Sequence, residues 1–242
     1  MRNSVEFTVW GRYALFTDPI TKIGGEKYSY QVPTYEALKG ILSSVYWKPT
    51  IIWVIDKVRV MKPIKSQTRS AKPVKYGGGQ ASHDLAIYTY LADVEYQVQA
   101  HFEWNLKRED LVHDRNEHKH HSVAKRMIER GGRRDVFLGT RECQGYVAPC
   151  IFGEGEGFYD DYPDELSFGL MFHGFDYPDE VESGKFHARF WHPKMVKGVI
   201  EFVRPNDNSN IRKFVRPMSA NPPATIGLAE EGLLDGYEEE RA

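Results

Sequence analysis

Hydrophobic periodicity up to about residue 148 is the feature that most restricts how this 242-residue chain can fold. Ser4–Trp10 alternates apolar with polar side chains, which predicts a half-buried strand. Thr34 is a typical N-cap before apolar residues at helical spacing, and Pro49 must end that helix. The same two periodicities predict the order strand, helix, strand, strand, helix, strand. The strands are expected at Ser4–Trp10, Ile51–Met61, Leu85–Trp104, and Asp135–Leu138 with Gly145–Val147, and the helices at residues 35–47 and Ser122–Arg130.

This order is the split βαβ arrangement, so we expect an α+β fold with a ferredoxin-like, RRM-like domain at residues 1–148. The open sheet of such a domain is a common RNA-binding platform. Beyond Ala148 the pattern predicts a small antiparallel β-domain at residues 149–218, with strands at Leu166–Phe172, Lys185–Trp191 and Val199–Val203. An acidic, poorly ordered tail is expected at residues 219–242.

Charge is distributed unevenly along the chain. Residues 1–148 carry 23 Lys and Arg against 16 Asp and Glu, whereas the remainder carries 9 against 18. This asymmetry suggests that the first part faces a polyanion, with chance clustering as the alternative.

The longest apolar run, Ile51–Ile55, is too short to cross a membrane, and no secretory signal is visible, so a cytoplasmic location is expected. Cys143 and Cys150 are too few for a disulfide framework or a four-thiolate zinc site.

Two segments concentrate the positive charge. Lys57–Lys75 contains seven cations and no acid, which predicts a basic hairpin or mobile loop. Asp114–Arg141 contains eight Lys and Arg residues together with three histidines, a composition suited to phosphate contacts. Within it, Gly131-Gly132 should cap the second helix and let the backbone approach a phosphate. A solvated, charged helix is the alternative for this segment.

Lys119-His120-His121 suggests a specific chemistry. RNA cleavage without a metal needs a base for the 2′-hydroxyl, an acid for the leaving 5′ oxygen and a cation for the charge on phosphorus. Histidine titrates near neutrality, and lysine can supply the cation. Tyr46, at the end of the first helix, could supply the third group if the fold brings the two helices together.

A metal site is the rival interpretation of the same segment. Histidines at 113, 118, 120 and 121 are close in sequence, and Asp114 and Glu117 could complete a ligand set. No metalloprotease or deaminase motif is present, and Lys119 within the cluster would oppose a cation. We therefore expect no metal and no cofactor.

The chain resembles the CRISPR-associated RAMP proteins of the subtype I-C system, in the "d" or Dvulg variant of the Cas-five group. The likeness runs from the N-terminus to about Arg216 and is strongest at Gly131–Cys143. The other matching stretches are Tyr13–Pro19, Ser29-Tyr30 with Val32–Thr34, and Tyr46–Thr50.

This resemblance implies a RAMP fold and a metal-independent endoribonuclease. Such a protein cleaves the CRISPR precursor RNA at the base of the repeat hairpin and stays on the 5′ handle of the guide RNA in a surveillance complex. The family's catalytic tyrosine matches Tyr46, its lysine–histidine pair matches Lys119 and His120, and its glycine-rich loop matches Gly131-Gly132. The expected partners are repeat RNA and the other subunits of a type I-C complex, with weak DNA binding as a further expectation.

The expected site therefore has a cleaving and a binding part. Tyr46, Lys119 and His120 are the expected catalytic residues, and the products should be a 2′,3′-cyclic phosphate and a 5′-hydroxyl. A non-catalytic RNA-binding scaffold and a metal-dependent DNA nuclease are the alternatives. The expected RNA-binding residues are Lys62, Lys65, Arg69, Arg115, His121, Gly131, Gly132, Arg133, Arg134 and Arg141.

Overall fold

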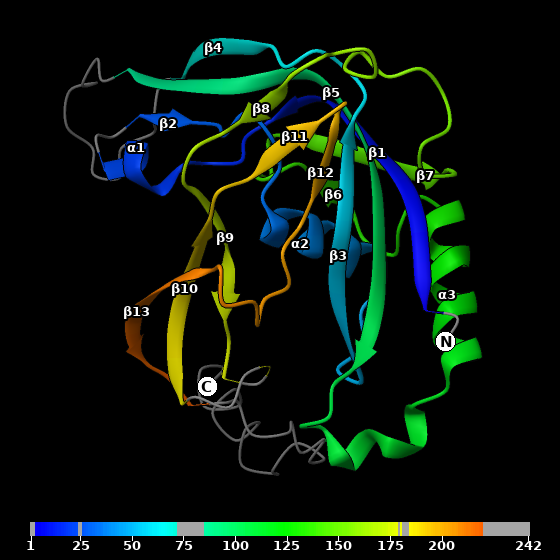
Figure 1. Ribbon diagram of the computed structural model, residues 1–242. Coiled ribbons are helices and arrows are strands. Elements are labelled where there is room, and N and C mark those ends of the chain that lie inside the picture. Colours follow the sequence, from blue (N-terminus) through cyan, green and yellow to red (C-terminus); the bar gives the residue numbers. More distant parts are fainter. Residues whose placement is uncertain (1–2, 24–25, 72–84, 179, 181–183, 220–242) are drawn as a thin grey trace, which may run out of the picture.

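The computed structural model describes residues 3–23, 26–71, 85–178, 180 and 184–219 (Figure 1). In chain order the elements are β1 (Ser4–Ala14), α1 (Pro19–Ile23), β2 (Lys27–Tyr28), α2 (Tyr35–Val45), β3 (Ile51–Val60), β4 (Ser66–Ala71), β5 (Ala86–Trp104), the 3-10 helix η1 (Glu109–Asp114), α3 (Glu117–Glu129), β6 (Val136–Phe137), β7 (Gln144–Pro149), β8 (Glu165–Ser167), β9 (Met171–Asp176), β10 (Lys185–Trp191), β11 (Lys194–Val196), β12 (Val199–Glu201) and β13 (Ile211–Pro217).

The predicted split βαβ order is confirmed. The central strands follow the spatial order β7-β1-β5-β3, and every neighbouring pair is antiparallel. Because β5 is antiparallel to both β1 and β3, these two strands run in the same direction with β5 inserted between them. Strands β2 and β4 also pair with β5, and β6 pairs with β7.

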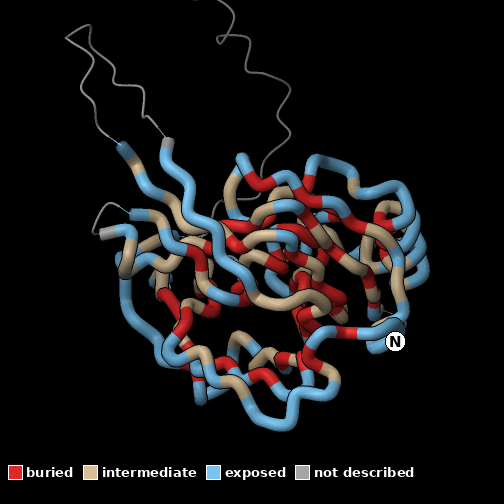
Figure 2. The backbone as a smooth tube through the Cα atoms, turned by 90° about the horizontal axis from the view of Figure 1, so that it is seen from above, coloured by how far each residue is buried: buried red, intermediate tan, exposed pale blue. Residues whose placement is uncertain are grey.

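Both main helices pack against this sheet and against each other. α2 contacts β3, α3 contacts β1 and β7, and α2 contacts α3, so the helices lie side by side. Thr34 caps α2 as predicted, since its side chain accepts a hydrogen bond from the amide of Ala37. Alternate residues of β1, including Phe7 and Val9, are fully buried. Figure 2 shows the buried residues gathered in the interior of the body, between the layers.

The prediction for the start of the second helix was wrong. α3 begins at Glu117, five residues before the predicted Ser122, and the side chain of Asn116 caps it by accepting from the amide of Lys119. The first turn of α3 is made of charged residues and histidines, so apolar periodicity does not reveal it. As a consequence, Lys119 and His120 lie on a helix.

The strand predicted at Leu166–Phe172 is also wrong, because the chain divides there into β8 and β9. Gly169, at φ +70°, lies between them, and β8 joins the large sheet whereas β9 joins a separate sheet of order β13-β10-β9. The predicted strands at Lys185–Trp191 and Val199–Val203 correspond to β10 and β12. The sequence did not predict β11 or β13.

Pairing in the large sheet crosses residue 148, where a domain boundary was expected. β12 pairs with β3, and β11 joins β12 to β8, so three strands of the expected β-domain extend the ferredoxin-like sheet. The other three form the separate sheet at the lower left of Figure 1, and its strand β9 contacts α2. The division into two domains stays a prediction.

The basic segment Lys57–Lys75 does not behave as one unit. Its first part belongs to β3, where Arg59 is buried and donates to Asp160 over 2.6 Å and to backbone carbonyls, so this arginine holds the fold together. Its second part forms β4, which pairs with β5 in an exposed hairpin arm (Figure 2). Lys72 and Lys75 lie outside the described residues, as does the expected acidic tail from residue 220 onward.

Candidate active site

Tyr46 and His120 meet where α2 and α3 lie side by side. Tyr46 is the C-cap of α2, with an extended backbone conformation that ends the helix. His120, Ala124 and Ile128 form the buried stripe of α3 at intervals of four residues, so the histidine occupies a core position. The Tyr46 hydroxyl lies 2.7 Å from Nδ1 of His120. The structure therefore brings together the two residues that the sequence singled out seventy-four positions apart.

The hydrogen bonds of His120 define which of its ring nitrogens carries a proton. Nε2 lies 2.8 Å from the backbone carbonyl oxygen of Asp114, which can only accept, so Nε2–H is the donor. When the ring is neutral, its lone pair lies at Nδ1, and the Tyr46 hydroxyl donates to it. Phe102 and Trp104 pack edge-on against the ring, which is completely buried. Tyr46 thus has a fixed proton acceptor behind it.

Asp114 links His120 to Lys119. One carboxylate oxygen accepts from the Lys119 ammonium group; the other accepts from the Thr50 hydroxyl at 2.6 Å and lies 3.5 Å from Nε2 of His120. Burial by itself raises the pKa of Asp114, but the hydrogen bonds from Lys119 and Thr50 outweigh it and lower this pKa to about 2. The ionised carboxylate can therefore balance a positive charge that forms on His120.

Tyr46 is protonated at neutral pH. Burial raises the pKa of Tyr46 to about 12, the charge of Asp114 acts in the same direction, and the guanidinium of Arg133 opposes both. A tyrosine with this pKa is a poor base by itself. It becomes useful as a proton relay, because it can give its own proton to His120 while it accepts another.

Arg133 and Arg134 lie at the end of α2 next to this group. Gly131 and Gly132 have positive φ values and cap α3 as predicted, with their amides donating to carbonyls of its last turn. The amides of Arg133 and Arg134 donate to the carbonyls of Val45 and Ser44. All four amides are thus used within the protein, so a phosphate would contact this turn through the exposed arginine side chains.

The side chains of His121 and Arg115 are engaged in hydrogen bonds to backbone carbonyls within the protein. His121 lies about one quarter of a helical turn away from His120, and its Nε2 donates to the carbonyl of Ser4 at 3.0 Å. Arg115 donates to the carbonyls of Asn105 and Arg108 in the preceding loop. Their expected RNA contacts stay predictions.

The remaining expected RNA-binding residues are not near Tyr46. Lys65 directly precedes β4 and Arg69 lies within it, and β4 pairs with the opposite end of β5 from Phe102. Lys62 forms an ion pair with Asp93 at 2.8 Å. Arg141 is exposed in the loop between β6 and β7. These four cations lie outside α2 and α3, and together they are called the second basic region.

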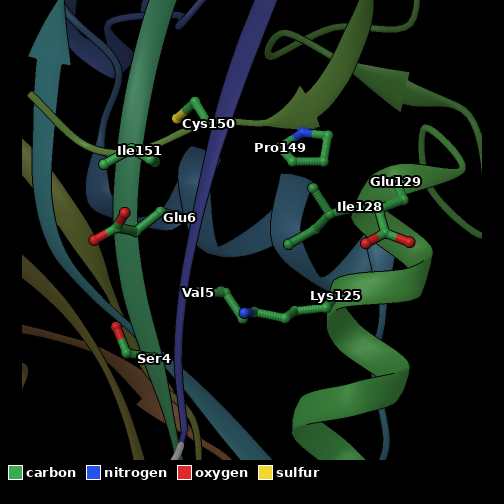
Figure 3. Close-up of a pocket in the computed structure, with 9 residues that line it drawn as sticks. All are labelled: Ser4, Val5, Glu6, Lys125, Ile128, Glu129, Pro149, Cys150 and Ile151. Carbon is green, nitrogen blue, oxygen red and sulfur yellow. The ribbon is translucent and has the colours of Figure 1, made fainter. Parts of the chain in front are cut away.

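One sizeable pocket is separate from this chemistry. A pocket of about 370 Å³ lies between β1, α3 and the end of β7, and its lining includes Glu6, Lys125, Glu129 and Cys150 (Figure 3). None of the expected catalytic residues lines it.

Among the residues that the structure describes, no three His, Cys, Asp or Glu side chains converge as metal ligands. In the same residues, no helix has the length and apolar character that a membrane span requires.

Residues 4–203 match the family model of the CRISPR-associated Cas5 proteins, in its Cas5d form. The chain belongs to this family. The match covers the split βαβ core together with β8 to β12, so it includes both helices that carry the Tyr46–His120 pair. The resemblance noted in the sequence is confirmed.

Relatives of this Cas5d-family chain support the same conclusion. A protein from Mannheimia succiniciproducens, named CRISPR pre-crRNA endoribonuclease Cas5d, is 33% identical over 169 residues that cover 61% of this chain and 73% of the relative. A Thermus thermophilus protein of the same name is 26% identical over 148 residues, covering 58% and 62%. The crystal structure of a CRISPR-associated protein is 34% identical, with a TM-score of 0.68 over 86% of this chain and 96% of that one. The predicted fold class is thereby confirmed.

The sequence of this Cas5d-family chain did not reveal the role of Asp114 or Thr50. Asp114 was considered only as the start of a basic segment and as a metal ligand, whereas the structure places its carboxylate between Lys119 and His120. Asn116 gave a signal, since an N-cap there would have placed Asp114 directly before the helix that bears His120. Thr50 gave none, because its contact crosses sixty-four residues.

Replacing Asp114 with asparagine should lower stability in a pH-dependent way. The pKa of Asp114 is lowered in the folded protein, so the ionised form contributes stability above about pH 4, and this is lost as the pH falls towards 2. We expect a loss of about 1–2 kcal/mol at pH 7 that shrinks below pH 4, measured by denaturant unfolding at several pH values. Asp110→Asn, in an exposed pair with Arg108, is the control and should change little. A constant difference across this range would contradict the prediction.

Proposed function

We propose that this chain is a metal-independent endoribonuclease that cleaves CRISPR precursor RNA within the repeat, at the base of its hairpin. The observation that carries the proposal is the hydrogen-bonded series from Tyr46 through His120 to Asp114. The names of the relatives from Mannheimia succiniciproducens and Thermus thermophilus, both pre-crRNA endoribonucleases, support the substrate class.

In the proposed reaction the RNA 2′-hydroxyl attacks the adjacent phosphorus. Its proton passes to the Tyr46 oxygen while the proton of Tyr46 passes to Nδ1 of His120, whose positive charge the Asp114 carboxylate balances. The bond from phosphorus to the 5′ oxygen then breaks, and the relay returns the proton to that oxygen. The products are a 2′,3′-cyclic phosphate and a 5′-hydroxyl. No water is consumed, and the proton taken from the 2′-hydroxyl is the one returned to the 5′ oxygen, so there is no net uptake or release of protons.

Lys119 is the proposed cation for the pentavalent phosphorane. Its side chain is half exposed, and it is held by Asp114 next to the relay. His120 is completely buried and Tyr46 is 4% exposed, so RNA would meet Tyr46 first and His120 would act through it. Because Tyr46 is almost fully buried, the proposal requires the residues that cover it to move when RNA binds.

After cleavage, the protein is proposed to stay bound to the 5′ handle of the guide RNA with other subunits of a type I-C surveillance complex, in the cytoplasm. Arg133 and Arg134 would hold RNA beside the cleavage site. The second basic region, with Lys65, Arg69 and Arg141, would hold RNA further along the strand.

Cleavage of repeat RNA by the wild-type protein in excess EDTA tests the proposal. We expect undiminished cleavage, with a cyclic phosphate on the upstream product identified by mass spectrometry. A 2′-deoxy nucleotide at the mapped cleavage position should stop the reaction. Loss of cleavage in EDTA would contradict the metal-independent mechanism. Tight binding without any cleavage would instead favour the non-catalytic scaffold.

A further inference from the structure

Trp47 is an exposed aromatic side chain directly after Tyr46. It is 52% exposed and the most exposed of the five tryptophans in the chain. The other four each pack against an aromatic ring, whereas no such ring contact involves Trp47 in the described part of the chain. An exposed indole beside a buried reaction centre contributes little to the core, so its position requires another explanation.

Open space borders this indole on two sides. One pocket, of about 290 Å³, is lined by Ser43, Ser44, Trp47, Arg133 and Arg134. A second, of about 180 Å³, shares Ser43 and Trp47 with the first and continues towards β3. Trp47 is thus a common wall between two adjoining hollows, and a planar group could lie against its face.

The walls around Trp47 offer the groups that a nucleotide needs. Arg133 and Arg134 are exposed and form no ion pair with any residue that the structure describes, so their guanidinium groups can receive a phosphate. The Ser43 and Ser44 hydroxyls donate to the carbonyls of Lys39 and Gly40. Each hydroxyl has therefore used its proton and keeps lone pairs to accept from the amino group of a base.

The Trp47 pocket also lies close to Tyr46. Trp47 follows Tyr46 in the chain, and Arg133 is close enough for its charge to oppose the rise in the Tyr46 pKa. A phosphate held by Arg133 would therefore lie within electrostatic range of the Tyr46 hydroxyl. An aromatic face for the base and a guanidinium for the phosphate are the two elements from which single-stranded RNA sites are built.

We infer that the Trp47 pocket, lined by Ser43, Ser44, Trp47, Arg133 and Arg134, binds the unpaired nucleotide that adjoins the scissile phosphate. The base stacks on the indole of Trp47, and the arginines hold the phosphate. This inference rests on the proposed endoribonuclease function, because it assigns a subsite to the same reaction. It makes Trp47 a positioning residue that acts on RNA binding and not on proton transfer.

Binding and cleavage measured separately on Trp47 variants test this inference. The binding probe is repeat RNA with 2′-fluoro groups throughout, which cannot be cleaved by 2′-hydroxyl attack. We expect Trp47→Ala to raise its Kd by about tenfold or more, and Trp47→Phe, which keeps an aromatic face, to stay within about threefold. RNA should also quench a part of the tryptophan fluorescence of the wild type that is missing in Trp47→Phe.

A matched control is Leu106→Ala, because Leu106 is equally apolar and more exposed but lies outside the pocket. It should leave Kd unchanged. Unchanged Kd in Trp47→Ala, or an RNA-dependent quench that persists in Trp47→Phe, overturns the inference. If the wild type binds with the Trp47 signal but never cleaves repeat RNA, the proposed function fails, and with it the link to a scissile phosphate, while nucleotide binding at Trp47 stands.

Discussion

Replacing Tyr46 with phenylalanine should lower the rate of repeat-RNA cleavage by about 10²–10⁴-fold. The change removes only the hydroxyl that lies 2.7 Å from Nδ1 of His120, so the relay loses the atom that would face the RNA. The ring keeps its packing, and the lost hydrogen bond should cost about 1 kcal/mol of stability. Single-turnover cleavage and RNA binding, measured on the same samples, separate the chemical step from affinity.

Binding of RNA by Tyr46→Phe should remain close to that of the wild type, because Arg133 and Arg134 are unchanged. Tyr146→Phe is the matched control, since Tyr146 is an exposed tyrosine of β7 with no contact to His120. It should cleave at the wild-type rate. If Tyr46→Phe cleaves as fast as the wild type, the tyrosine relay is wrong and another group must accept the proton of the 2′-hydroxyl.

The order of elements could be predicted because it depends on local periodicity. β1 alternates between buried and more exposed residues from Ser4 to Arg12, and α2 has an N-cap, an apolar stripe and a proline that follows it. The start of α3 could not be predicted in this way, because its first buried position is His120 and a histidine does not register as apolar. β13 has no buried residue, so it carries no apolar alternation to detect.

The candidate site was predicted in part, and through the resemblance more than through chemistry. Composition pointed to Lys119 and His120 and offered Tyr46 as a possible third group, and the resemblance then matched Tyr46 to a catalytic tyrosine. The contact of Asp114 with Thr50, and the docking of the Gly131 turn on the end of α2, depend on tertiary packing. No local pattern encodes such contacts, since each joins segments from different elements.

Replacing Gly139 with alanine should destabilise the fold by about 3 kcal/mol or more. Gly139 has φ +94°, and a Cβ there would lie 2.0 Å from the carbonyl oxygen of Leu15. That carbonyl belongs to backbone and cannot rotate away, and the amide of Leu15 is itself held by the carbonyl of Leu138 at 2.9 Å. The glycine in this strongly matching stretch is therefore required by the close approach of two backbone segments.

Gly153→Ala separates this clash from the conformational cost of a positive φ. Gly153 has φ +93°, almost the same as Gly139, but a Cβ there would have no neighbour within 4 Å. The free energy of unfolding of Gly153→Ala should fall only by the roughly 1–2 kcal/mol that a side chain costs at a positive φ. Denaturant unfolding of both variants gives the difference, which is the contribution of the Leu15 contact. Equal losses would mean that the loop between β6 and β7 can move away from the end of β1, and that Gly139 is needed only for its backbone conformation.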